Sequence, residues 1–215
     1  MFNLHPTLAP ETYPFAWMVD RWVGGGVLEY ENIEAAAYVH ELAIENTDGG
    51  PYLRFESRIW LAAEPAGIVD KEESGATTYG KLTKERLWSV STGYLRVNPN
   101  VAKRADGSSA VEAMVSSPAG TAQLWVGLVN GPRLQMVTDA VARSASGADF
   151  TSAKLMAGNV ASDLFYAYDM EAFGSELRPY LAGRLSHTNA DDVVLPGDDE
   201  AAADADGAAS AEDAQ

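Results

Sequence analysis

The sequence of 215 residues lacks several features that would indicate particular kinds of site. It contains no cysteine, which excludes disulfides and thiolate metal ligands and suits a reducing compartment. Its three histidines, His5, His40 and His187, lie far apart and show no zinc-ligand spacing. No apolar run approaches the roughly 18 residues of a membrane span, and the N-terminus does not follow the pattern of a signal peptide. We therefore expect a cytoplasmic protein with no membrane partner.

Basic residues are also scarce, with 15 Lys and Arg against 31 Asp and Glu and a net charge of −16. Such a chain offers no basic surface for nucleic acid, so we expect no nucleic-acid partner. Nine of the acidic residues lie from Asp191 onward, where aromatic and basic residues are absent. We expect residues 189–215 to be a disordered acidic tail, because such a segment buries too little apolar surface to offset its ordering entropy. The tail either serves solubility or mediates protein interaction.

The rest of the chain is dominated by short segments in which apolar and polar residues alternate, which is typical of half-buried strands. Turn signals such as Asn130-Gly131 separate them. The pattern predicts an all-β fold, an antiparallel up-and-down barrel of about ten strands. A cap with a short helical turn over residues 15–19 occupies residues 1–19, the barrel residues 20–188, and residues 63–78 and 98–109 form loops. The expected strands are 22–30, 33–45, 53–59, 82–90, 93–97, 110–115, 121–129, 133–142, 149–156, 160–170 and 180–187.

Three motifs resemble those of a known family. Trp22, Gly24 and Gly26 match a Gly-X-Trp-X-Gly-X-Gly motif in which Asp20 replaces the first glycine. Leu87-Trp88-Ser89 is similar to a Phe-Trp-Arg segment, and Pro179-Tyr180-Leu181 to a Pro-His-Leu triplet. Together they resemble the nitrobindins, small heme-binding β-barrels with the calycin shape of fatty-acid-binding proteins. The resemblance implies a cofactor-binding role for Trp22, Gly24 and Gly26.

In that family the histidine of Pro-His-Leu is the axial ligand of heme iron, and Tyr180 stands at its position here. A phenol must lose a proton, with an ordinary pKa near 10, before it is a good ligand. Tyrosinate does bind ferric heme in catalase, usually with a cation nearby. By strand alternation Arg178 and Arg184 share the face of Tyr180. We expect a packed or hydrogen-bonded Tyr180; the alternative is heme b with Tyr180 as axial ligand.

Alternation over residues 33–45 places His40 with the apolar set and Glu41 and Glu45 on the other face. His40 is either a satisfied inward histidine or a polar contact in a ligand cavity. The two glutamates are interpreted as solvated.

The functional hypothesis is a nitrobindin-like barrel without the heme-binding histidine, whose ligand is a small apolar molecule or none. No motif demands catalysis, whereas the family members with the histidine are credited with nitric oxide binding and peroxynitrite isomerisation. One alternative is therefore a heme protein acting on nitric oxide or peroxynitrite through Tyr180. Another is a scaffold whose acidic tail binds proteins, and the sequence leaves a homodimer open.

Overall fold

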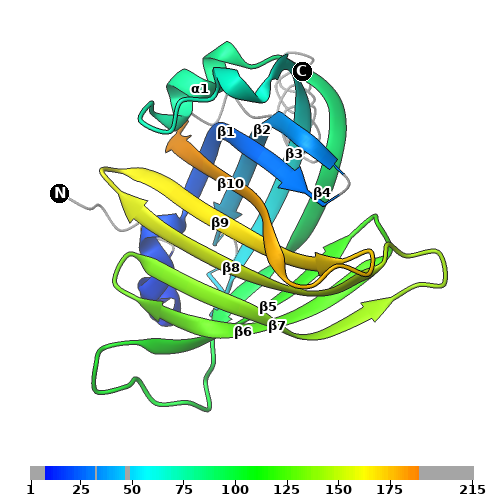
Figure 1. The fold of residues 1–215 in the computed structure, drawn as a ribbon. Helices are drawn as coiled ribbons and strands as arrows, with labels where there is room; N and C mark the ends of the chain where they lie inside the picture. The colour runs from blue at the N-terminus through cyan, green and yellow to red at the C-terminus, as the bar shows by residue number, and fades with distance from the viewer. Residues whose placement is uncertain (1–7, 32, 47–48, 189–215) are drawn as a thin grey trace, which may run out of the picture.

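The computed structural model describes residues 8–31, 33–46 and 49–188, and these form a closed antiparallel β-barrel (Figure 1). Each strand pairs with its neighbours in sequence, and β1 pairs with β10 to close the sheet. The predicted all-β barrel is confirmed. The strands are β1 (Asp20–Tyr30), β2 (Ile33–Glu45), β3 (Leu53–Pro65), β4 (Lys84–Val97), β5 (Ser109–Ser117), β6 (Thr121–Asn130), β7 (Arg133–Arg143), β8 (Phe150–Val160), β9 (Asp163–Ala172) and β10 (Arg178–His187).

Most strand positions follow the alternation in the sequence, with alternate side chains pointing into the barrel. Two predicted strands, 82–90 and 93–97, form the single strand β4, because pairing with β3 continues through Ser91 and Thr92. The hairpin predicted at Asn130-Gly131 is present: Asn130 pairs with Arg133, and Gly131 has a φ of 52°. Glycine adopts such a positive φ without steric cost.

The N-terminal segment covers one end of the barrel with η1 (Pro10–Met18), a 3₁₀ helix. Phe15 is fully buried, and the indole N–H of Trp22 donates to the carbonyl of Met18 at 2.8 Å. The predicted cap is therefore helical, over a longer range than residues 15–19. His5 and the predicted acidic tail lie outside the described residues.

The connection from β3 to β4 contains η2 (Ala66–Ile68) and a helix, α1 (Gly75–Lys81), where the sequence predicted only a loop. Ser74 caps α1 by accepting a hydrogen bond from the backbone N–H of Thr77 at 3.1 Å. The helix packs against the outer side of β1 and β10 (Figure 1), where Ser186 accepts a hydrogen bond from the N–H of Ala76. A seven-residue helix depends on such packing, which composition does not reveal. None of the described helices is long and apolar enough to cross a membrane.

The covering of β1 and β2 by the β3–β4 connection corrects the interpretation of Glu41. Its side chain does point outward, yet the residue is only 4% exposed. The hydroxyl of Tyr79 donates to Glu41 at 2.7 Å, and the ammonium of Lys84 forms an ion pair with it. Lys84 also lies 4.3 Å from the ring centroid of Trp60. Glu41 is thus a buried, paired carboxylate; only Glu45 of the two glutamates is partly exposed, with its ion pair to Arg21.

Candidate functional site in the barrel interior

Glycines in β1 and β10 let the barrel close tightly around two tyrosines. A Cβ on Gly26 would lie 2.0 Å from the carbonyl oxygen of Ala182 and 2.7 Å from the hydroxyl of Tyr38. A Cβ on Gly183 would lie 2.5 Å from that hydroxyl and 3.0 Å from the hydroxyl of Tyr166. A side chain at either position would clash, at Gly26 with the Ala182 carbonyl and the Tyr38 hydroxyl and at Gly183 with the tyrosine hydroxyls, so both positions require glycine.

Those two hydroxyls belong to a buried polar network centred on Tyr166. The Tyr166 hydroxyl lies 2.8 Å from the hydroxyl of Tyr38 and 2.6 Å from Nδ1 of His40, while Nε2 of His40 lies 2.9 Å from Oγ of Ser57. Burial lowers the pKa of His40 to about 3 and raises the pKa values of Tyr38 and Tyr166. All of these side chains are therefore neutral at pH 7, and both nitrogens of His40 are engaged.

Two β-bulges place a second polar pair across one end of the barrel. The register of β10 against β9 shifts between Pro179 and Leu181, which leaves Tyr180 as the extra residue. The register of β4 against β3 shifts in the same way around Trp88. Bulges re-aim side chains, and here the indole N–H of Trp88 donates to the hydroxyl of Tyr180 at 2.5 Å. The ring of Tyr180 also packs edge-on against Tyr30 and Tyr168.

The two arginines expected beside Tyr180 are engaged elsewhere. Arg184 pairs with Phe165 on the outer face, and its Nε donates to Asp163 at 2.6 Å. Its predicted orientation was wrong, because the bulge at Tyr180 reverses the alternation between the two residues. Arg178 is 3.5 Å from Glu31 in an exposed ion pair at the barrel rim. Burial raises the pKa of the Tyr180 phenol, and the hydrogen bond from Trp88 opposes this only in part.

Solvent reaches the interior face of β3 and β4, at three serines that we call the serine wall. Ser57 points inward because it contacts His40, Ser91 pairs with Ser57, and Ser89 pairs with the buried Ile59. Ser57 and Ser91 are nonetheless partly exposed, and Ser89 is exposed. Inward side chains of a barrel filled by its own residues would be buried, so the interior holds space beside the serine wall.

The other side of the interior is mainly apolar and aromatic. Trp125, Met136, Leu155 and Tyr168 belong to one apolar cluster, together with Tyr180. They come from β6, β7, β8 and β9, across the barrel from β3 and β4. The interior therefore has a polar wall of small hydroxyl side chains and a facing wall of large apolar ones.

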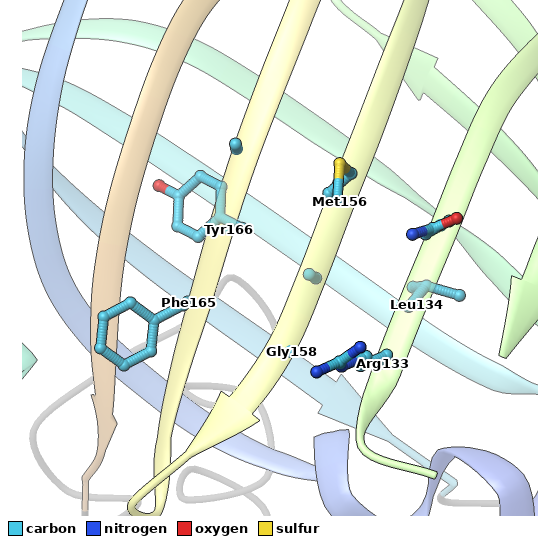
Figure 2. Close-up of a pocket in the computed structure, with 9 residues that line it drawn as sticks. Arg133, Leu134, Met156, Gly158, Phe165 and Tyr166 are labelled. Atoms are coloured by element: carbon cyan, nitrogen blue, oxygen red, sulfur yellow. The ribbon is translucent and has the colours of Figure 1, made fainter. Parts of the chain in front are cut away.

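A separate groove of about 360 Å³ lies on β7, β8 and β9 (Figure 2). It is lined by three consecutive residues of each strand, 133–135, 156–158 and 165–167. Gln135 and Met156 in this set are exposed. An interior pocket would be lined by residues two apart on each strand, such as Leu134 and Met136. The groove is thus a feature of the outer surface and is distinct from the interior site.

The residues singled out from sequence do not form one cluster. Tyr180 is at the end of the barrel where β10 begins, and Trp22 is at the opposite end. Six residues of extended strand separate Trp22 from the pair Leu28–Leu181 next to Tyr180, a distance of about 20 Å. Trp22 is fully buried and stacks on His187, whose Nδ1 lies 2.9 Å from Asp20. His40 lies between the two ends, paired with Gly24.

The interior residues that sequence reasoning did not select are Tyr38, Tyr166, Ser57 and Ser91. Tyr38 and Ser57 had a signal, because each alternates with the apolar set of its own strand. The partners of Tyr166, which are Tyr38 and His40, lie 126 or more residues away in sequence. Ser91 is identified only by its pairing with Ser57 on the neighbouring strand.

Closure of the sheet by its first and last strands, with aromatic hydroxyls directed inward, defines a single-sheet β-barrel of ten antiparallel strands. The chain belongs to the family of THAP4-like, heme-binding β-barrel domains, whose model matches residues 11–187. The resemblance to nitrobindins is thereby confirmed.

Relatives of this chain carry two different names. It is 35% identical to a ferric nitrobindin-like protein of Beutenbergia cavernae, over 86% of this chain and 98% of that protein. It is also 35% identical to a peroxynitrite isomerase of Nocardioides sp., over 86% of this chain and 97% of that protein. The crystal structure of Rv2717c from M. tuberculosis matches with a TM-score of 0.64 at 21% identity, covering 85% of this chain and 99% of that chain. This last similarity establishes the fold alone.

The described residues do not supply the ligand that ferric heme needs. His40 has both nitrogens hydrogen-bonded in the interior, and His187 lies at the η1 end against Asp20 and Trp22. Tyr180 is directed inward, but its raised pKa favours the neutral phenol, and no described cation contacts it to stabilise a phenolate. The site therefore does not fit an iron-bound heme at neutral pH.

Proposed function

We propose that this chain binds a small, largely apolar molecule in the barrel interior and does not use heme iron. The observation that supports this most directly is the serine wall, where inward side chains remain in contact with solvent. Barrels of eight or more strands are wide enough to hold one small ligand. Small-molecule sites are mostly apolar with a few placed polar groups, which matches an interior of four large apolar side chains facing three serines.

The heme-dependent alternative has less support from the geometry. Peroxynitrite isomerase is the name of several relatives, and that name belongs to those proteins. In this chain the residue at the expected ligand position is a phenol held by Trp88, with a pKa raised by burial. The proposal for this chain is accordingly binding, without a catalytic step.

The test is to fill the interior beside the serine wall and measure binding of Nile red, a neutral apolar dye that fluoresces in apolar surroundings. Ser91→Phe places a ring inside the barrel, and Thr92→Phe places the same ring on the outer face, because Thr92 is exposed and adjacent in the strand. We expect saturable one-site binding to the unaltered protein and to Thr92→Phe, with at least about tenfold weaker binding to Ser91→Phe, since the added ring occupies the ligand space.

The unfolding midpoint of each variant is measured alongside binding. Equal affinity in a folded Ser91→Phe would place the dye outside the barrel and contradict the proposal. Absence of saturable binding to the unaltered protein would contradict it as well.

A further inference from the structure

Among the described residues, Arg86 lies at the barrel rim near Tyr180 without an ion-pair partner. Arg86 pairs with Leu61, which packs in the interior cluster of Leu28 and Tyr38, so Arg86 lies on an inward row where β4 begins. Its guanidinium is 5.6 Å from the ring centroid of Trp88. Arg86 is exposed and forms no ion pair with any described residue.

Two other arginines at this end differ from Arg86 in having partners. Arg178 is ion-paired with Glu31, and Arg143, at the end of β7, is ion-paired with Asp149. Carboxylates are abundant in a chain with a net charge of −16, yet none of the described ones pairs with Arg86. Its guanidinium, on an inward row, is therefore available to an anionic group of a ligand.

A second donor, the phenol of Tyr180, lies at the same end of the barrel. The Tyr180 oxygen accepts the N–H of Trp88, which leaves the phenol hydrogen free to donate, and no described acceptor takes it. Because burial raises the pKa of Tyr180, the phenol stays protonated at neutral pH and does not repel an anion. Trp88 lies between the two donors, with Arg86 over its ring and Tyr180 at its N–H.

We propose that the ligand is an amphiphilic carboxylate, whose carboxylate is held at the rim by Arg86 and Tyr180 while its apolar chain lies inside the barrel. This inference rests on the proposed binding function and specifies its ligand class. Arginine holds carboxylates well because its planar fork donates two parallel hydrogen bonds. The apolar chain lies against Trp125, Met136 and Tyr168, and solvent around the serine wall is displaced.

The experiment is calorimetric titration of the full-length protein with three probes of equal chain length: decanoate, decan-1-ol and decylamine. We expect decanoate to bind about tenfold more tightly than the alcohol, as a charge-assisted hydrogen bond at a partly exposed site allows, and the amine to bind more weakly than both. Arg86→Gln should bring decanoate and decan-1-ol to within about twofold of each other. Lys103→Gln removes an equal charge from the β4–β5 loop, at the opposite end, and should leave the preference intact.

Tyr180→Phe separates the two donors and should lose part of the preference. Raising NaCl from 20 to 500 mM should weaken binding of decanoate and leave the alcohol unchanged, since only the ionic contact is screened. An equal decanoate preference in Arg86→Gln, or equal affinity for decanoate and the alcohol in the unaltered protein, would overturn this inference while the binding function stands. If none of the three probes binds, the proposed function fails together with it.

Discussion

At the scale of single residues, the interior of this barrel is defined by neutral polar groups that satisfy one another. His40 illustrates this, because its two nitrogens contact Tyr166 and Ser57 and its pKa falls to about 3 on burial. The pKa decides the charge state of the interior at neutral pH: the site offers hydrogen bonds and no positive charge. An anionic group on a ligand therefore finds its partner at the rim, at Arg86, and not at His40.

The depressed pKa of His40 has a consequence for stability. Between pH 6.5 and about 3 the unfolded chain binds a proton on His40 that the folded protein does not, so stability is lost as pH falls through this window. We expect the difference in unfolding free energy between the unaltered protein and His40→Gln to change by up to about 1.4 kcal/mol per pH unit there, in the direction that favours the variant at low pH.

Urea unfolding at pH 4.5, 5.5, 7.5 and 8.5 measures this difference. At pH 7.5 and 8.5 the histidine is neutral in the folded and the unfolded state. The difference in unfolding free energy between the two proteins should therefore be the same at these two pH values, which provides the control. Parallel behaviour at pH 4.5 and 5.5 as well would contradict a buried, neutral His40.

At the scale of secondary structure elements, the two bulges are the features that build the rim. A regular β10 would continue the alternation, and Tyr180 and Leu181 would point to opposite sides. With the bulge both pack inside, Leu181 in the cluster of Tyr38 and Tyr180 against Tyr30. The matching irregularity at Trp88 in β4 brings its N–H to the phenol across the opening.

Because the bulge directs position 180 inward, an imidazole placed there should bind the iron of a heme inside the barrel, which the neutral phenol of Tyr180 does not. We expect Tyr180→His to bind hemin more tightly than the unaltered protein and to give a sharp, saturable Soret band, since neutral imidazole needs no proton loss at pH 7. Tyr180→Phe, which keeps the ring and removes the ligand atom, is the matched control. An unchanged titration in folded Tyr180→His would mean that the interior does not admit the macrocycle.

At the scale of the whole molecule, closure of the barrel depends on the seam between β1 and β10. Seven residue pairs from Trp22–His187 to Leu28–Leu181 form it, and four of its positions have no room for a side chain: Gly24, Gly25, Gly26 and Gly183. The seam also carries α1 on its outer side. The glycine motif that resembles a cofactor-binding motif thus has a direct structural role in this chain.

Gly26→Ala should destabilise the barrel by about 3 kcal/mol or more, because the added methyl group meets the Ala182 carbonyl and the Tyr38 hydroxyl. Gly67→Ala is the control, since a Cβ there meets no atom within 4 Å, and its effect should stay within about 0.5 kcal/mol. The midpoints of urea unfolding measure both changes in stability, provided that the dependence of the unfolding free energy on urea concentration is the same for all three proteins. Comparable stabilities of the two variants would show that the seam adjusts without cost.

Features set by residues close together in sequence were predicted. Strand alternation predicted the barrel and the face of His40, because side-chain direction in a regular strand has a period of two residues. The turn signal Asn130-Gly131 predicted the hairpin between β6 and β7. The motifs around Trp22 and Tyr180 predicted the family, since their residues are contiguous in sequence.

Three features required the tertiary structure. The orientation of Arg184 reversed at a bulge, which inserts one residue and breaks the period of two. The burial of Glu41 followed from a cover contributed by residues 38 and 43 positions away, Tyr79 and Lys84. The sequence by itself determined where most of the strands lie and which family the chain belongs to. Only the tertiary structure decided that Trp88 and Tyr180 meet across the opening. These residues are 92 positions apart in sequence, and local patterns contain no information about contacts over such a separation.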